Sequence, residues 1–196
     1  YDAALLRAEA HVAPRAMAEW PDNGGAEAMV RLRDGGFIVL GENAKDMPEG
    51  LRPGLWFAGD PVRLPGRAFR FSYRPPVGYR PTDVTELPDG RLVVIDRKFS
   101  LQDAFTATVS IVERDAIRPG RVAHGREIAR YAAPVVHDNF EAIAVTREGH
   151  DTILWIASDD NQYFFQRSLL LKFRLAETRV SKRGSARIPE GSEPIR

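Results

Sequence analysis

The sequence predicts an all-β fold, and three observations support this prediction. Short apolar runs rich in branched and aromatic residues recur along the chain and end at Gly, Pro, Asp or Asn. Turn signals separate paired runs at Asp34-Gly35, Asp89-Gly90 and Glu148-Gly149. Helical periodicity is weak throughout, so the apolar runs are expected to be strands.

The clearest unit spans residues 138–175. The run 153–157 is apolar without interruption, which is typical of a strand buried on both faces. Polar and acidic residues stand before the first strand, at 138–141, and after the second, at 158–161. The strands of this unit are expected at Ala142–Val145, Ile153–Ala157 and Leu169–Phe173.

Two earlier units follow a similar plan. The strands of the first are expected at Glu27–Leu32, Phe37–Leu40 and Phe69–Tyr73. The long stretch 44–66 contains several Pro and Gly residues and is expected to be irregular. The strands of the second unit are expected at Val84–Leu87, Arg91–Ile95, Ala107–Val112 and Gly125–Ala129.

One acidic residue recurs near the first strand of each unit. Glu27, Asp83 and Glu141 are separated by 56 and 58 residues. A nearly constant period indicates a repeat architecture, and four short antiparallel strands per repeat are typical of a propeller blade. We therefore predict a β-propeller, of which about three blades of four antiparallel strands are visible in this chain.

A closed propeller needs about four to eight blades, so these three are expected to belong to a larger one. An upstream half or self-association would cover the apolar faces at the open ends. The chain begins at Tyr1 rather than Met, so we expect an upstream segment. The predicted divisions are an upstream remnant or linker at 1–23, the propeller domain at 24–176 and a flexible polar tail at 177–196.

Composition excludes several classes of function. The 196 residues carry a net charge of +1, which gives no argument for binding nucleic acid or an anionic membrane. The absence of cysteine excludes disulfides, thiolate catalysis and cysteine-based zinc sites. No apolar run approaches the roughly 20 residues of a membrane-spanning helix.

Three segments of the last unit carry a family resemblance: 138–145 (DNFEAIAV), 154–161 (LWIASDDN) and 166–173 (QRSLLLKF). The stretch 79–92 matches an earlier part of the same pattern. Together they resemble the bacterial phytase-like family, described as having esterase-like activity of phytase. The similarity runs from about Gly24 to Leu175 and corresponds to the C-terminal portion of that domain.

The resemblance implies a β-propeller that is exported, and therefore periplasmic or secreted, with a signal peptide in its precursor. It also implies a hydrolase that acts on phosphate or other esters of a small molecule. One departure concerns the first strand, where such families have Glu-Gly and this chain has Glu141-Ala142. The extra methyl group would narrow the access of a ligand to Glu141.

The repeated acids are the predicted catalytic residues. A propeller places the first strands of its blades around a central channel, so Glu27, Asp83 and Glu141 are predicted to meet there. Neighbouring carboxylates repel one another unless a cation lies among them or some are protonated. With Asp159 as a fourth ligand, they are predicted to bind a divalent cation, Ca²⁺ or Mg²⁺, that assists ester hydrolysis.

Basic side chains near the same strand ends are the predicted substrate-binding residues. Arg97, Lys98 and Arg167 can neutralise a substrate phosphate. Asn139 is predicted to contact the substrate as well. The neighbouring pair Asp160-Asn161 can supply further oxygen atoms.

Structural roles are the alternative for the same residues. Residues 159–161 are typical of turns, in which their side chains accept backbone N–H groups. Glu27, Asp83 and Glu141 can instead join neighbouring blades by accepting N–H groups. At the level of function, the alternatives are a non-catalytic propeller that binds a ligand or protein, and a lactonase-like propeller.

Other catalytic motifs are missing from the sequence. It contains no G-x-S-x-G, H-E-x-x-H or Walker pattern. His137 can act as a general acid or base, or it can be a loop histidine with a satisfied hydrogen bond. Phe140 and Trp155 are predicted core residues, and the loop 163–165 is predicted either to line a pocket or to pack under a neighbouring blade.

Overall fold

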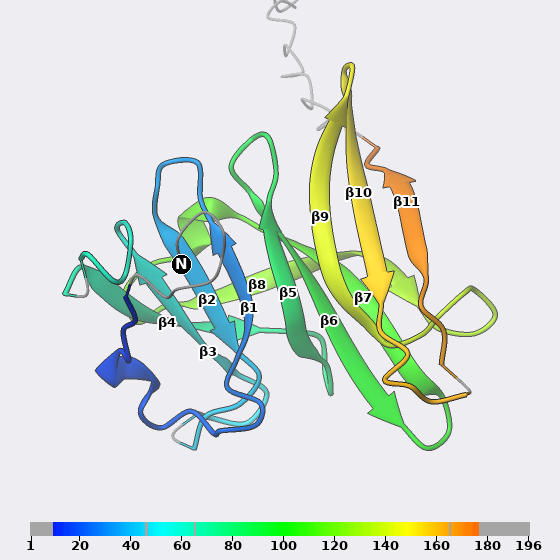
Figure 1. The fold of residues 1–196 in the computed structure, drawn as a ribbon, viewed down its shortest axis with the longest axis horizontal. Helices are drawn as coiled ribbons and strands as arrows, with labels where there is room; N and C mark the ends of the chain where they lie inside the picture. Colours follow the sequence, from blue (N-terminus) through cyan, green and yellow to red (C-terminus); the bar gives the residue numbers. More distant parts are fainter. Residues whose placement is uncertain (1–9, 46, 65, 165, 177–196) are drawn as a thin grey trace, which may run out of the picture.

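The computed structural model describes residues 10–45, 47–64, 66–164 and 166–176. Within them the protein is all-β, as predicted, and short 3₁₀ turns are the helical elements (Figure 1). The predicted tail at 177–196, the first nine residues of the predicted N-terminal segment and Phe165 lie outside the described residues.

The strands form two units of four and one of three. The first unit contains β1 (Ala26–Arg31), β2 (Phe37–Gly41), β3 (Arg52–Phe57) and β4 (Ala68–Arg74). The second contains β5 (Arg80–Glu86), β6 (Leu92–Ser100), β7 (Ala104–Val112) and β8 (Val122–Tyr131). The third contains β9 (Phe140–Glu148), β10 (Asp151–Ser158) and β11 (Leu170–Arg174). The 3₁₀ turns are η1 (Arg15–Met17) and η2 (Arg114–Ala116).

Successive strands within each unit pair in antiparallel fashion. Residues 72–74 of β4 also pair in parallel with residues 122–124 of β8, which joins the first two units into one eight-stranded sheet. The third unit is a separate sheet in the order β11-β10-β9. The prediction of four strands per unit is therefore met by two units, whereas the described residues supply three strands to the third.

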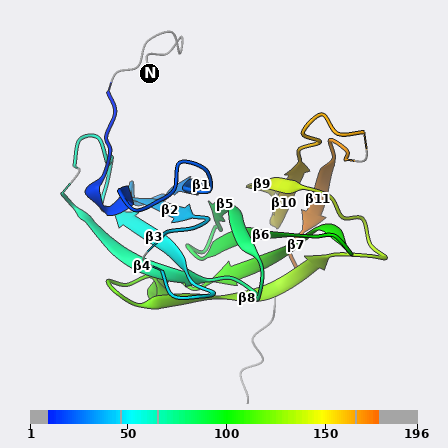
Figure 2. The ribbon, with the colours of Figure 1, turned by 90° about the horizontal axis from the view of Figure 1, so that it is seen from below.

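The first strands of the three units lie next to one another. Strand β5 contacts both β1 and β9. Figure 2 shows β1, β5 and β9 toward one side of the molecule, with β4 and β8 toward the other. Residues near the ends of these first strands are consequently brought from distant parts of the sequence to one region.

The prediction of an irregular stretch at 44–66 is wrong, because β3 lies within it. Pro53 lacks an N–H group and Gly54 lacks a side chain, so both argue against a strand in the sequence. The structure uses this glycine, since a Cβ atom at Gly54 would lie 2.5 Å from the ring of Phe71 on the adjacent strand. Leu55 and Phe57 follow and are buried.

Two apolar layers hold the units together. One, which includes Leu40, Tyr73 and Val94, lies between the first and second units, and another lies between the second and third. Phe140 is fully buried in the latter layer, as predicted. The prediction for Trp155 is wrong: it is half-buried, and the ammonium of a neighbouring lysine lies 5.1 Å from its ring centre.

Candidate functional site

A β-bulge interrupts the first strand of every unit, and it sets which residues are equivalent. The bulged residue, which is skipped in the pairing with the second strand, is Glu27 in β1, Thr82 in β5 and Glu141 in β9. The predicted alignment of Asp83 with the two glutamates is therefore shifted by one residue. The repeat at this position is Glu, Thr, Glu rather than three acids.

Asp83 joins the second unit to the third. Its Oδ2 atom accepts the backbone N–H of Ile143 at 2.8 Å, and its Oδ1 atom accepts that of Val84 at 2.8 Å. Burial raises the pKa of the Asp83 carboxyl above its ordinary value of 3.8, although these two hydrogen bonds act in the opposite direction. Both oxygens are engaged, so the contacts favour the inter-unit role considered above.

Arg97, Asn139 and Glu141 form a compact group, here called the arginine–glutamate cluster. Arg97, near the end of β6, donates from Nη1 to Glu141 Oε1 and to Asn139 Oδ1. Asn139 Nδ2 donates to the same Glu141 oxygen at 2.9 Å and to the carbonyl oxygen of Asp159 at 3.1 Å. The structure thus brings together three of the predicted site residues, from the second and third units.

The arginine–glutamate cluster combines a fixed cation with an accessible carboxylate. Asn139 is fully buried, whereas 25% of the Arg97 side chain and 37% of the Glu141 side chain are exposed. The hydrogen bonds to Glu141 use Oε1, and within the described part of the chain none reaches Oε2. One oxygen is therefore able to accept a proton from a solvent molecule.

Arg167 lies beside this cluster and is anchored by the loop that precedes β9. Its Nε atom donates to Asp138 Oδ2 at 3.2 Å, and its Nη2 atom donates to the carbonyl oxygen of His137 at 3.3 Å. Asp138 is buried. The Nδ1 atom of His137 donates in turn to the carbonyl oxygen of Phe105 at 3.1 Å, so this side chain has the satisfied hydrogen bond of the loop-histidine alternative.

Lys98 and Glu27 lie outside the arginine–glutamate cluster. Successive residues of a strand point to opposite faces, so Lys98 projects away from the side chain of Arg97. Its Nζ atom lies 6.0 Å from the ring centre of Tyr79. Glu27 is exposed on β1 in the first unit.

The acidic loop after β10 consists of local turns. Asp159 Oδ1 accepts the N–H of Asn161 at 3.0 Å, and Asp160 Oδ1 accepts that of Gln162 at 2.8 Å. The latter hydrogen bond lowers the pKa of Asp160 below its ordinary value of 3.8. Ser168 donates to Asp160 Oδ2 at 3.0 Å and closes the loop. These contacts favour the turn alternative for residues 159–161.

The acids predicted as metal ligands are separated from one another in the described part of the chain. In the described portion of the chain, no three His, Asp or Glu side chains lie close enough together to hold a metal ion. Glu141 is neutralised by Arg97, and both carboxylate oxygens of Asp83 accept backbone N–H groups. Within the described residues, the predicted acidic ligands are therefore not gathered around one position.

Sequence reasoning missed a buried acid between the first and second units. Asp96 is fully buried and accepts the hydroxyl of Tyr73 at Oδ2, at 2.8 Å. Its Oδ1 atom, like the hydroxyls of Thr108 and Ser110, has no hydrogen-bond partner among the described residues. Burial raises the pKa of Asp96 from 3.8 to about 7.

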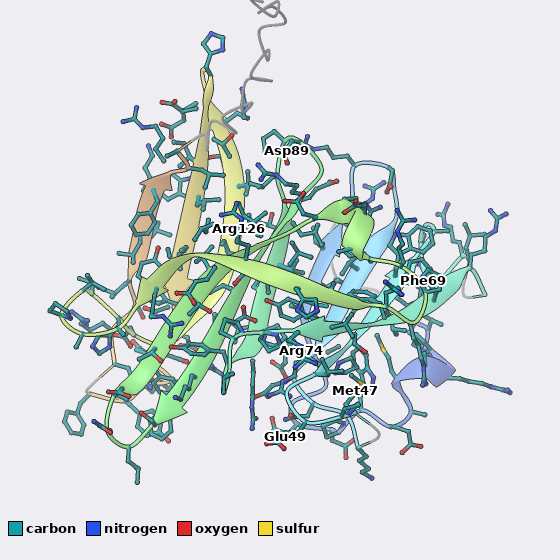
Figure 3. The ribbon with its side chains drawn as sticks, turned by 180° about the vertical axis from the view of Figure 1, so that it is seen from behind. Met47, Glu49, Phe69, Arg74, Asp89 and Arg126 are labelled. Carbon is teal, nitrogen blue, oxygen red and sulfur yellow. The ribbon has the colours of Figure 1, made fainter. Side chains whose placement is uncertain are left out.

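A large cavity lies between the second and third units, near the β5–β6 and β9–β10 hairpins. Its volume is about 1060 Å³. It is lined by Asp89 and Arg126, which Figure 3 labels, and by Arg147, His150 and Arg174. None of the predicted site residues lines it.

The chain belongs to the Phytase-like family, described as esterase-like activity of phytase, whose family model matches residues 2–162. The match includes the arginine–glutamate cluster. No curated protein and no solved structure was found to match the chain. Over the described residues, no helix has the length and apolar character needed to cross a bilayer.

Proposed function

We propose that the three units are consecutive blades of a β-propeller that hydrolyses phosphate or other esters. The family membership and the adjacent first strands support this proposal. A blade of four antiparallel strands accounts for the first two units, and the third follows the same pairing through its first three strands. The family resemblance also supports export to the periplasm or beyond the cell.

The reaction is placed at the arginine–glutamate cluster, because it joins a guanidinium to a half-exposed carboxylate. The Arg97 guanidinium donates to a negative oxygen of the ester and stabilises the charge that grows there. Glu141 accepts a proton from a water molecule at Oε2, and the water oxygen attacks the phosphorus or carbonyl carbon. The bond to the leaving oxygen breaks, and the proton passes to that oxygen, which gives an acid and an alcohol.

A divalent cation, with Ca²⁺ as the first candidate, remains a prediction from the sequence. Glu141 is its first candidate ligand, and carbonyl oxygens and water can complete the coordination of such an ion. A rise in melting temperature on adding Ca²⁺ that disappears in Glu141→Ala would support the ion at this position. A wild-type protein whose melting temperature is insensitive to Ca²⁺ and to a chelator would contradict it.

Turnover tests the proposal with a matched control from another junction. Glu42 Oε1 lies 2.7 Å from Arg80 between the first and second units, which makes it an inter-unit ion pair like that of Glu141 with Arg97. On p-nitrophenyl acetate and p-nitrophenyl phosphate, Glu141→Gln is expected to lower kcat/KM by about 100-fold or more on the ester that is turned over. Glu42→Gln is expected to change it less than about threefold, because Glu42 pairs with Arg80 and is not the group that takes the proton of the water.

Two alternatives make different predictions in the same assay. A non-catalytic propeller that binds a ligand or protein gives no turnover on any ester of the panel. A lactonase-like propeller gives turnover on lactones and none on phosphate esters. Equal loss in Glu141→Gln and Glu42→Gln would contradict the assignment of the reaction to the arginine–glutamate cluster.

A further inference from the structure

Six large apolar side chains are exposed on three loops that border the arginine–glutamate cluster. Leu101 at the β6–β7 hairpin and Phe164 in the loop after β10 are almost completely exposed, at 98% and 99%. The other members are about half exposed, and the full set, here called the apolar rim, is Phe99, Leu101, Val135, Val136, Tyr163 and Phe164.

The topology places the apolar rim at one end of the molecule. Strands β6, β8 and β10 end there, and β7, β9 and β11 begin there, because neighbouring strands are antiparallel. In Figure 1 the β6–β7 hairpin and the connection after β10 lie at the lower right, and the β8–β9 connection projects to the right above them. Clustered apolar side chains on a surface are typical of a binding site rather than of scattered exposure.

Phe105 links Phe99, one member of the apolar rim, to Arg97 of the charged cluster. The ring of Phe99 lies 4.9 Å from that of Phe105, measured between centres, and the Arg97 guanidinium lies 5.5 Å from the same Phe105 ring. Arg167 binds the loop that carries Val135 and Val136 through its hydrogen bond to His137. A ligand held by Arg97 would therefore have apolar side chains within reach.

The loops are held in shape by local hydrogen bonds, so the apolar rim is a defined surface. In the hairpin, Ser100 Oγ accepts the N–H of Asp103 at 3.0 Å. In the loop after β10, the Asp159 and Asp160 side chains accept the N–H groups of Asn161 and Gln162, and Ser168 donates to Asp160. A loop that is already ordered loses less conformational entropy when it binds a ligand.

The charges at this end argue against a highly phosphorylated substrate. Arg97 is neutralised by Glu141 and Arg167 by Asp138, and Lys98 projects from the opposite face. Among the described residues, a ligand with many phosphate groups would meet too few unpaired cations at this end. An ester with one anionic or polar head and an apolar chain would satisfy both the arginine and the exposed side chains.

We propose that the substrates of this site are amphiphilic esters, whose polar head binds Arg97 and whose apolar acyl, alkyl or aryl chain lies on the apolar rim. This inference rests on the proposed function, because it concerns the same site. Leu101 and Phe164 set the preference for chain length. Each buried CH₂ group contributes about 0.8 kcal/mol, so four further carbons in contact favour binding by up to about 200-fold.

Alkylphosphonates test the proposal without requiring turnover, because their tetrahedral anionic head resembles a phosphate monoester and also the tetrahedral intermediate of carboxylic ester hydrolysis. Calorimetry of the full chain is expected to show octylphosphonate binding at least about tenfold more tightly than butylphosphonate. The double variant Leu101→Ser/Phe164→Ser is expected to lose that difference while keeping the affinity for butylphosphonate. Leu64→Ser, at an exposed leucine in the β3–β4 connection, is the matched control and should keep it.

The outcomes separate this inference from the proposed function. A preference for the longer chain that needs Leu101 and Phe164 supports the inference, whether or not an ester is turned over. The absence of turnover on every ester would contradict only the proposed function. Turnover or binding without any chain-length preference overturns the inference and leaves ester hydrolysis standing. A dimer that dissociates in the double variant, with unchanged phosphonate affinities, would assign the apolar rim to contacts between copies of the chain and also overturns it.

Discussion

Replacing Asp96 by Asn is expected to stabilise the protein at pH 8 and to change its stability little near pH 4. Asp96 is fully buried between the first two units, and burial raises its pKa from 3.8 to about 7. Burial is the largest effect on this pKa, and the charge of Glu127 raises the pKa further. The hydroxyl of Tyr73 and the charge of Arg52 lower the pKa but do not offset burial. The folded protein therefore binds a proton at Asp96 more tightly than the unfolded chain does.

The direction of the effect follows from this difference. Because the pKa is raised in the folded state, the stabilising contribution is fully present below about pH 4 and is lost as the pH rises to about 7. The interval from 3.8 to about 7 corresponds to roughly 4 kcal/mol, at about 1.4 kcal/mol per pH unit. Asparagine is neutral at every pH, so Asp96→Asn is expected to avoid this loss.

Urea denaturation from pH 4.5 to pH 8.5 measures the effect. The stability of Asp96→Asn relative to the wild type is expected to rise by about 2–4 kcal/mol over this range. Asp89→Asn is the control, because hydrogen bonds from Arg91 lower the pKa of Asp89, which keeps it ionised throughout. A difference between Asp96→Asn and wild type that stays constant with pH would refute the reasoning.

Two further predictions concern how the units are joined and packed. Asp83→Ala is expected to lower the free energy of unfolding by about 2–4 kcal/mol, because the N–H groups of Ile143 and Val84 lose their acceptor. Asp83→Asn is expected to lower it by less, since an amide keeps one acceptor oxygen. Urea denaturation at pH 7 measures both variants. Gly54→Ala is expected to cost about 1–3 kcal/mol, because the new methyl group would meet the ring of Phe71, whereas Gly66→Ala, with open space around it, should be nearly neutral in the same measurement.

The all-β fold and most strands were predictable because the apolar runs are long and turn residues mark their ends. Strand β3 was missed because Pro53 and Gly54 are unfavourable in strands, and the close approach of Phe71 that requires the glycine comes from another strand. A bulge could not be recognised either, since it adds one residue without a sequence signal. In β5 the residue skipped by the bulge is Thr82, one position before Asp83. The sequence-based alignment therefore matched Asp83, rather than Thr82, to the two glutamates.

The members of the arginine–glutamate cluster were predictable, but their pairing was not. Arg97, Asn139 and Glu141 were selected because polar residues at strand ends are typical of sites. The sequence assigned Glu141 to a group of carboxylates, whereas the structure gives it an arginine from the preceding unit. Contacts between units depend on how sheets pack face to face, which the periodicity of a single strand does not encode.

A crystal structure of the chain with octylphosphonate bound tests the central claim most directly. We expect phosphonate oxygens within hydrogen-bond distance of the Arg97 guanidinium, one oxygen near Glu141 and the alkyl chain against Leu101 and Phe164. The contradicting result is a phosphonate in the cavity of about 1060 Å³, on Arg126 and Arg147, with the arginine–glutamate cluster unchanged.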